Sequence, residues 1–314
     1  MKSQTRRNPS TTYVPRAQAG YFRNRARNNI IVFLLLAAPA LIWFLVMVGY
    51  PAVSMFFISL FSWEGGMLRP RTFAWFSNYI ELFTSPDFYE ALRLSVIQVV
   101  LSVPLTMIPA FALGYFLSLR RPGYRILRVI FFSPALISVA VRAMMFYGIF
   151  LPDGLLNGLL RLIGLSALTH LWLGEIDTAL LSIVIISVWG GIGYNAVLLF
   201  TFLSTVSQEL YEAAQLDGAG PWACMWQIAF PISLDFFGIL TTLEFIWITL
   251  GTAGLIFLLT EGGPGTASTT LAYLMYDRAF ITLRLGISQA IAVILFIVGL
   301  SAMLLIRRWT RETI

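Results

Sequence analysis

The chain has very little of the chemistry that enzymes and metal sites use. Its 314 residues include one cysteine, Cys224, and one histidine, His170, and only 11% of them are charged. A single cysteine excludes an intrachain disulfide and a multi-cysteine metal site, and a single histidine makes neither a histidine-pair metal motif nor a histidine-based triad credible. A soluble domain carries about 25% charged residues, so the deficit points to a membrane protein. We expect no catalytic residue and no metal site in this chain.

Apolar runs are what the sequence has in abundance. Hydrophobic residues make up 58% of the chain and aromatic residues 15%, as in proteins whose Trp and Tyr populate membrane interfaces. About 20 consecutive, mostly apolar residues span a bilayer as a helix. We therefore expect an all-α membrane protein with six transmembrane helices within residues 29–306. The expected spans are 30–50, 94–119, 129–150, 179–203, 236–259 and 287–306.

Positive charge is concentrated at three places. Seven basic residues lie in an arm over 1–28, four arginines in the nine residues "RRPGYRILR", and three in the "RRWTR" of a tail over 307–314. Basic residues mark the cytoplasmic side, and these places alternate onto one side of a six-span chain. Both termini are therefore predicted to be cytoplasmic. We interpret the basic arm as an orientation signal rather than a nucleic-acid site, because a span follows it at once. The connections over 62–93 and 151–178 then lie outside, and the first contains a short amphipathic helical stretch.

One cytoplasmic connection, residues 206–234, breaks the charge rule. It includes "YEAAQLDGAGPWACMWQIAFPIS", which is acidic and has no Lys or Arg. The pattern predicts a helix over 208–216 that ends at Gly218, since glycine supplies the left-handed conformation of a helix C-terminus. Pro221 fits the first position of a second helix, which we expect to run to about Ala229 and to end at Pro231.

The second helix of this loop is predicted to carry an apolar face. Trp222, Met225, Trp226 and Phe230 would form that face and could meet a cytoplasmic partner protein. The alternative is an interfacial helix-turn-helix resting on lipid headgroups. The lack of basic residues weakens that alternative, because anionic lipids attract Lys and Arg at about 1 kcal/mol each.

The same stretch resembles the EAA loop of ABC-transporter permeases, whose pattern is approximately E-A-A-x-x-D-G-A, nine residues and I-x-L-P. The matching residues are Glu212, Ala213, Ala214, Asp217, Gly218, Ala219, Ile228 and Pro231. Farther on, "LLTEGGPGTASTTLAYLMYDRAF" resembles an element of sugar-uptake permeases of the maltose-transporter type, in particular their first permease subunit. The resemblance implies that coupling to an ATPase subunit involves Glu212, Ala213, Ala214, Asp217, Gly218, Ala219, Pro221, Trp222, Met225, Trp226 and Ile228.

The resemblance also implies a fold, a transport activity and a set of partner subunits. The fold would be that of a type I ABC importer permease, and the chain would move a sugar or sugar-like solute by alternating access. Its partners would be a second homologous permease subunit, two nucleotide-binding ATPase subunits and an extracytoplasmic solute-binding protein, in the lipid of a bacterial or archaeal inner membrane, with no nucleic acid. This chain has no nucleotide-binding motif, so ATP and Mg are expected in the partner subunits. The alternative is a self-sufficient secondary transporter, which would need ion-coupling carboxylates near mid-membrane and internal repeats.

The sequence departs from that family at several positions. The family usually has an aromatic residue where Met225 lies, often an arginine in the second helix of the loop, and a further proline near Asp235. A Phe-Asp pair that often precedes the L-T-x-G-G-P element is replaced here by Ala253 and Gly254. Substrate contacts expected at that pair therefore do not transfer to this chain.

Polar and aromatic residues within the spans are the candidates for the substrate pathway, since ionisable groups in lipid are costly and usually face a cavity. Arg142 could pair with Glu244, line the pathway, or extend towards an interface. For Glu244, a gate or packing role competes with sugar contact. Trp189, Tyr194 and Asn195 could bind a sugar, although "WGGIGYNAV" could equally serve helix packing through Gly190, Gly191 and Gly193. A weaker set is Trp247 and Thr249.

Overall fold

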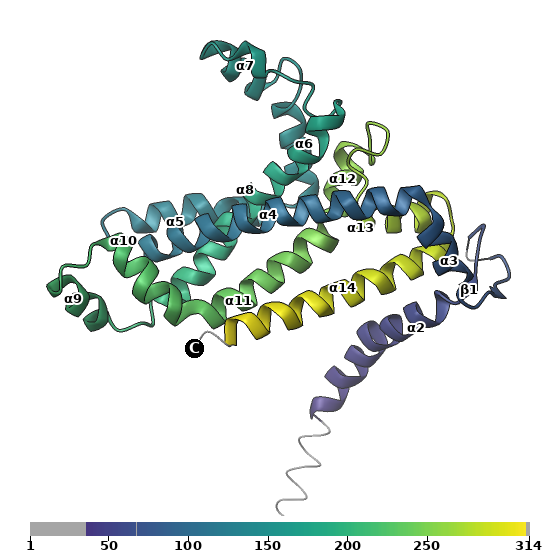
Figure 1. Cartoon of the computed structure of the whole chain (residues 1–314), viewed down its shortest axis with the longest axis horizontal. Coiled ribbons are helices and arrows are strands. Elements are labelled where there is room, and N and C mark those ends of the chain that lie inside the picture. The colour runs from purple at the N-terminus through teal and green to yellow at the C-terminus, as the bar shows by residue number, and fades with distance from the viewer. Residues whose placement is uncertain (1–35, 67, 312–314) are drawn as a thin grey trace, which may run out of the picture. The chain divides into compact units, whose positions relative to one another are not determined.

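The structure is a computed structural model that describes residues 36–66 and 68–311 (Figure 1). The basic arm over 1–28 lies outside the described residues. The described residues up to Ser54 and those from Met55 onward belong to two separate units, and the following paragraphs concern the second unless stated. The elements are η1 (Leu45–Gly49), α2 (Tyr50–Ile58), β1 (Phe61–Ser62), β2 (Thr72–Phe73), α3 (Ser77–Thr84), α4 (Pro86–Ser118), α5 (Tyr124–Phe132), η2 (Ser133–Leu136), α6 (Val139–Ile149), α7 (Leu155–Leu162), η3 (Ser166–Leu168), α8 (Ile176–Leu203), α9 (Gln208–Leu216), α10 (Pro221–Cys224), η4 (Met225–Ala229), α11 (Phe230–Ile246), η5 (Trp247–Gly251), α12 (Ala253–Leu259), α13 (Leu271–Tyr276), η6 (Asp277–Ile281) and α14 (Leu285–Arg311).

The helical architecture confirms the expected fold class. Five helices among the described residues are long and apolar enough to cross a membrane, and a bent pair of helices makes up to six if that pair is one span. Strand structure in the described residues is limited to a two-residue pairing of β1 with β2, antiparallel with Phe61 opposite Phe73, and an isolated bridge between Glu64 and Arg284. The five are Leu36–Ile58, Pro86–Ser118, Ile176–Leu203, Pro221–Leu259 and Leu285–Thr310.

The third expected span, 129–150, is not one helix. Tyr124–Leu136 and Val139–Ile149 meet at an angle of 101°. Pro134 lies in the 3₁₀ turn η2, and its missing N–H removes a hydrogen bond from the end of the first half. Ser138 is extended, with φ −60° and ψ 153°, and its hydroxyl accepts a hydrogen bond from the backbone N–H of Val141. Such a cap starts a new helix, so the break has its own local cause.

The expected end of a helix at Pro231 is wrong. The chain continues as one helical rod over Pro221–Leu259, which includes the π-helical turns η4 and η5. In η4 the N–H of Phe230 bonds to the carbonyl of Met225, five residues back. This local π-helical spacing lets the helix pass Pro231, whose ring and missing N–H would disrupt a regular α-helical ladder.

The second span begins earlier than expected. α4 starts at Pro86, with Asp87 in its first turn, a combination that favours a helix N-terminus. The amphipathic stretch expected over 62–93 is therefore α3 followed by the first turns of α4. Pro104 and Pro109 both lie inside α4, as expected for prolines in a span with close helical neighbours.

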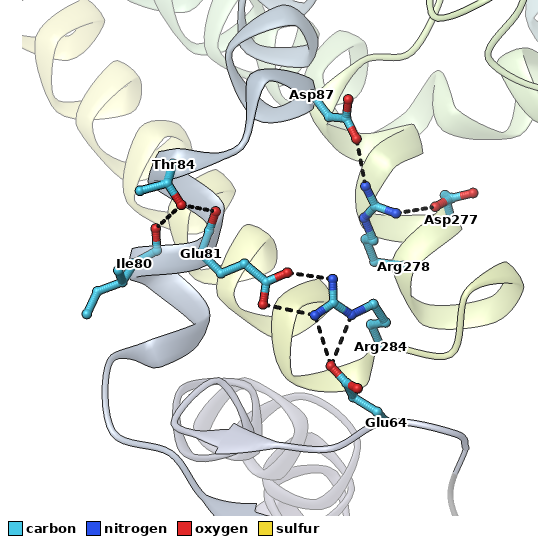
Figure 2. A network of polar contacts seen from close by, with 8 residues as sticks. All are labelled: Glu64, Ile80, Glu81, Thr84, Asp87, Asp277, Arg278 and Arg284. Carbon is cyan, nitrogen blue, oxygen red and sulfur yellow. Dashed lines mark hydrogen bonds and ion pairs between the residues drawn. The ribbon is translucent and has the colours of Figure 1, made fainter.

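An ionic network joins the segment after β1, α3, the first turn of α4, η6 and the residue before α14 (Figure 2). The guanidinium of Arg284 donates to Glu81 at 2.6 and 2.9 Å and to Glu64 at 2.9 and 3.1 Å. Next to it, Arg278 donates to Asp87 at 3.1 Å and lies 3.5 Å from Asp277. The network therefore holds together segments that are about 200 residues apart in the sequence, as the separations of 203 and 220 show.

Replacing Arg284 with lysine is expected to lower the free energy of unfolding by about 1 kcal/mol. A guanidinium binds two carboxylates at once through several N–H donors in one plane, whereas an ammonium has no such planar set of donors. The measurement is thermal unfolding in detergent at low and at high salt. The loss should shrink in high salt, since the pair is partly solvent-exposed and is screened. Arg93→Lys, at an exposed pair with Glu90 within one helix, is the matched control and should change stability less. An equal loss in both variants would contradict the assignment.

Candidate coupling loop and buried polar residues of the spans

The turn that ends α9 is built as the sequence predicts. Gly218 has φ +88°, its N–H bonds to the carbonyl of Gln215 at 3.0 Å, and the N–H of Ala219 bonds to the carbonyl of Ala214 at 2.9 Å. These two bonds are those of a Schellman motif, which terminates a helix at a left-handed residue. At the other end the Ser207 hydroxyl accepts from the N–H of Glu209 at 3.3 Å. The helix of the loop thus has defined ends at both termini.

One residue of α9 fixes it to the helical bundle. Tyr211 is the buried residue of this helix, and its ring lies 6.1 Å from that of Tyr115 in α4. Both belong to a hydrophobic cluster that also contains Cys224 and Met225. Burial raises the pKa of the Tyr211 phenol above its ordinary value. α9 is therefore attached to α4 through an aromatic contact and is otherwise largely exposed.

The predicted docking face is only partly present. Trp222 is 60% exposed and Trp226 is 46% exposed, whereas Met225 is 0% exposed. The expectation that Met225 lies on the surface is wrong, because its side chain packs into the hydrophobic cluster that contains Tyr115 and Tyr211. Phe230 is half-buried against Phe111, 5.2 Å away between ring centroids. Of the other motif residues, the exposed ones are Glu212, Ala213, Asp217, Gly218 and Pro221, and the half-buried ones are Ala214, Ala219 and Ile228.

Arg142 lies at the break between the two halves of the bent span. It is 7% exposed, and its Nη2 donates to the carbonyls of Ile137 at 3.2 Å and Pro134 at 3.5 Å. Its guanidinium therefore binds carbonyl groups at the C-terminal end of the first half, where a cation is favoured, and the Pro134 carbonyl also accepts from the N–H of Ile137 at 3.3 Å. Arg142 does not pair with Glu244 in the described part of the chain, and it lies inside the protein rather than extending to an interface.

Replacing Arg142 with leucine is expected to destabilise the protein by about 2 kcal/mol, because the Ile137 carbonyl at the break loses the guanidinium donor. Thermal unfolding of the purified chain measures the loss. Arg125→Leu, at an exposed position in the first half of the same span, is the control and should have a much smaller effect. Equal stability of the Arg142 variant and the wild type would show that the arginine does not hold the break.

Glu244 and Asn195 meet between α8 and α11. Glu244 is 5% exposed and Asn195 is 2% exposed, and the Asn195 amide donates to Glu244 Oε2 at 2.9 Å and to the carbonyl of Gly191 at 3.0 Å. A Cβ atom on Gly191 would lie 2.8 Å from Glu244 Oε1. The glycine therefore provides the space that the carboxyl group occupies.

The other glycines of "WGGIGYNAV" serve helix packing. A Cβ atom on Gly190 would collide with the guanidinium of Arg142, and one on Gly193 would collide with the backbone carbonyl of Phe131. The packing role that the sequence left open for this motif is thus supported. Close approach of backbones at small residues is typical of helix contacts in membranes.

The remaining pathway candidates are not gathered into one site. Trp189 is half-buried beside Phe146, 5.2 Å between ring centroids. Tyr194 is 48% and Trp247 50% exposed, and the Thr249 hydroxyl donates to the carbonyl of Phe245 in its own helix. Two cavities, of about 420 and 380 Å³, are lined by residues that are not among the pathway candidates. The first is lined by Asp235, Gly238, Ile239, Thr242, Leu243, Ile246, Met303, Arg307 and Thr310, and the second by Arg128, Val129, Phe132, Ser133, Leu136 and Val197.

Sequence reasoning missed a buried polar row. Gln98, Ser102 and Thr106 of α4 are each at most 1% exposed. Their spacing of four residues places them on one face of the helix, and this periodicity of polar residues inside an apolar span was the available signal.

Known proteins match the chain over most of its length. Residues 102–313 match the family described as "Binding-protein-dependent transport system inner membrane component". The probable ABC transporter permease protein YurN of Bacillus subtilis is 37% identical over 284 residues, which cover 89% of this chain and 95% of the relative. The sulfoquinovosyl glycerol transport system permease protein SmoG of Agrobacterium fabrum is 28% identical, over 85% of this chain and 86% of the relative.

A solved structure shares the fold. The chain resembles a subunit in the crystal structure of a bacterial ABC transporter involved in the import of the acidic polysaccharide alginate, with a TM-score of 0.78 at 20% identity, over 93% of this chain and 98% of that one. The fold is thus that of an ABC importer permease, as the sequence predicted. The chain belongs to the family of binding-protein-dependent transport system inner membrane components, and so it is a multi-pass inner-membrane transport subunit rather than an enzyme.

Proposed function

We propose that this chain is the permease subunit of an ATP-driven importer for a sugar or sugar-like solute, and that residues 206–234 couple it to an ATPase subunit. The observation that carries the coupling role is the construction of the loop. A helix with two defined ends, α9, is held by Tyr211 against α4, while Trp222 and Trp226 remain exposed beside it. Exposed Trp side chains next to a fixed turn are typical of protein contact surfaces.

The sugar class is supported by what the relatives' names say of those proteins. They include a sulfoquinovosyl glycerol permease, a diacetylchitobiose uptake permease and a lactose transport permease. An sn-glycerol-3-phosphate permease is also among the relatives, so a sugar-like phosphorylated solute belongs to the same proposal.

The proposal includes partners that this chain needs. A second homologous permease subunit would complete the pathway, two ATPase subunits would bind ATP and Mg on the cytoplasmic side, and a solute-binding protein would deliver the solute from outside. A transporter of the same fold has been crystallised with an alginate pentasaccharide-bound periplasmic protein, which supports the last of these. Both termini of the chain would be cytoplasmic.

Coupling would then follow a short physical route. Movement of the docked ATPase subunits displaces α9, and the Tyr211–Tyr115 contact passes the displacement to α4, which packs along α8. The transporter interconverts between an outward-facing and an inward-facing state. ATP can shift the populations of these two states only by the difference between its binding free energies to them. Arg142, Glu244, Trp189, Tyr194, Asn195, Trp247 and Thr249 remain candidates for the pathway.

The test is to reconstitute the chain in liposomes with and without the proteins encoded beside its gene. We expect solute uptake and solute-stimulated ATP hydrolysis only when all subunits are present. Uptake by this chain alone, driven by an ion gradient, would overturn the importer assignment in favour of a secondary transporter. A binding screen of sugars and sugar phosphates on the neighbouring solute-binding protein identifies the solute class.

A further inference from the structure

Two rows of residues face each other where α4 runs beside η5 and the end of α11. The first row is Gln98, Ser102 and Thr106, and eight residues of helix extend about 12 Å. The second row is Glu244, Ile248 and Thr252, with the same spacing of four residues. We call the space between the two rows the α4–α11 seam.

Contacts at both ends place the rows opposite each other. At one end the Thr252 hydroxyl, which donates to the carbonyl of Ile248 at 2.8 Å, lies 3.5 Å from Gln98 Oε1. At the other end Thr106 and Glu244 converge on Gly191, because a Cβ atom there would lie 2.8 Å both from the Thr106 methyl group and from Glu244 Oε1. The two helices are therefore antiparallel along the seam, with Ser102 and Ile248 at its middle.

The seam contains polar atoms without a protein partner. Gln98 Nε2 and Ser102 Oγ are buried and have no hydrogen-bond partner within residues 36–66 and 68–311, and Thr106 Oγ1 and Glu244 Oε1 make no hydrogen bond of good geometry there, although the Thr106 hydroxyl lies within reach of the Glu244 carboxyl group. The four residues are at most 5% exposed. A buried polar group left unpaired costs about 1–3 kcal/mol, and Gln98 and Ser102 place two such groups on one face of a span. A ligand that pairs with them would remove that cost.

The chemistry of the four atoms selects the ligand. The Gln98 amide nitrogen only donates, the Glu244 carboxylate oxygen accepts when ionised, and the two hydroxyls do both. Water pairs with donors and acceptors alike, and buried water typically makes about three hydrogen bonds to such groups. A bound metal cation would use oxygen ligands alone and would leave the amide donor of Gln98 unpaired.

We propose that the α4–α11 seam binds a file of internal water molecules between Gln98 and Glu244. The inference does not depend on the solute or on the ATPase partners. The water molecules connect Thr252 at one end to the Glu244–Asn195 pair at the other. They make the seam a hydrated line between two membrane-spanning helices.

The experiment is X-ray hydroxyl-radical labelling of the full-length chain in lipid nanodiscs, with H₂¹⁸O added immediately before exposure. Radicals form from bound water and oxidise the nearest side chains even where these are buried. Ile248 and Ile291 are matched probes, because both are 0% exposed and Ile291 lies in an apolar cluster. We expect oxidation at Ile248 several-fold above that at Ile291. Equal labelling of the two would show a dry seam and overturn the proposal.

A triple variant and a comparison of three salts provide two further tests. The triple variant Gln98→Leu, Ser102→Ala, Thr106→Val should reduce labelling of Ile248 to the level of Ile291, while labelling elsewhere stays unchanged. Should the triple variant not fold, the wild-type comparison still decides. Melting of the wild type in NaCl, KCl and choline chloride should be the same. A stabilisation by Na⁺ or K⁺ that Glu244→Gln abolishes would assign the seam to a cation and overturn the water proposal.

Discussion

Replacing Gly218 with proline is expected to abolish co-purification of the ATPase subunits while the chain still inserts and folds. Proline fixes φ near −65° and has no N–H, whereas Gly218 has φ +88° and donates to Gln215. The substitution therefore destroys the turn that sets α9 against α10. A docking loss above about 1.4 kcal/mol lowers the affinity at least tenfold. The measurement is the amount of ATPase recovered with the tagged chain from membranes of cells that express all subunits.

Gly220→Ala is the matched control for this variant. Gly220 lies two residues farther along, has φ −75° and, like Gly218, has open space where a Cβ atom would be. It should therefore retain the ATPase subunits. A Trp222→Ala, Trp226→Ala double variant should lose them without any change of backbone. Normal recovery of the ATPase with Gly218→Pro and with the double variant would refute the coupling role of residues 206–234.

Replacing Gly193 with valine is expected to prevent α8 from packing on the bent span and to destabilise the chain by about 3 kcal/mol or more, which is the upper range for overpacking. A Cβ atom at this position would collide with the carbonyl group of Phe131 and lie 3.2 Å from the N of Phe132. These are backbone atoms, so no side-chain rotation relieves the collision. The measurement is thermal stability of the chain in detergent, read by size-exclusion chromatography of a fluorescent fusion.

Gly299→Val controls for the change of residue type in a membrane helix. Gly299 lies inside α14 and has nothing within 4 Å of its Cβ position, so this variant should elute and melt like the wild type. A wild-type melting temperature in Gly193→Val would contradict the close approach of α8 and Phe131.

The sequence predicts the loop better than it predicts the spans. α9 begins and ends at the expected residues because serine and glycine stop signals act locally, through bonds to neighbouring backbone groups. The burial of Met225 was not predictable in this way. Which side of a helix faces the core depends on where the bundle lies, and Met225 and Trp226 are equally apolar in the sequence.

Whether a spanning helix is interrupted or continues also depends on features other than the length of its apolar segment. The third expected span contains a proline and a serine cap that turn the helix by 101°, whereas Pro231 is passed without a break because η4 takes up the change in hydrogen bonding. Both are prolines in apolar runs. The difference lies in the backbone around each one, and the apolar length of a segment does not encode it.

The sequence predicts the parts of the candidate site that form a contiguous motif. It does not predict contacts between residues that are far apart in the sequence. The sequence identifies Glu244 and Asn195, 49 residues apart, as polar pathway candidates within the spans, but their hydrogen bond arises only from the packing of α8 on α11. The same holds for Arg142, whose acceptors at the break exist only because the helix is interrupted there.

The bend in the third span has a mechanical consequence. α8 is one helix of 28 residues, and both half-spans pack on it. The first half contacts it near Phe200, whose ring is 6.3 Å from that of Tyr124, and the second half packs near Ile183 and Ile186. The axes of the two halves lie 101° apart, and both halves contact α8. A displacement of α8 along the axis of one half is therefore a displacement across the axis of the other, because the two axes are nearly perpendicular.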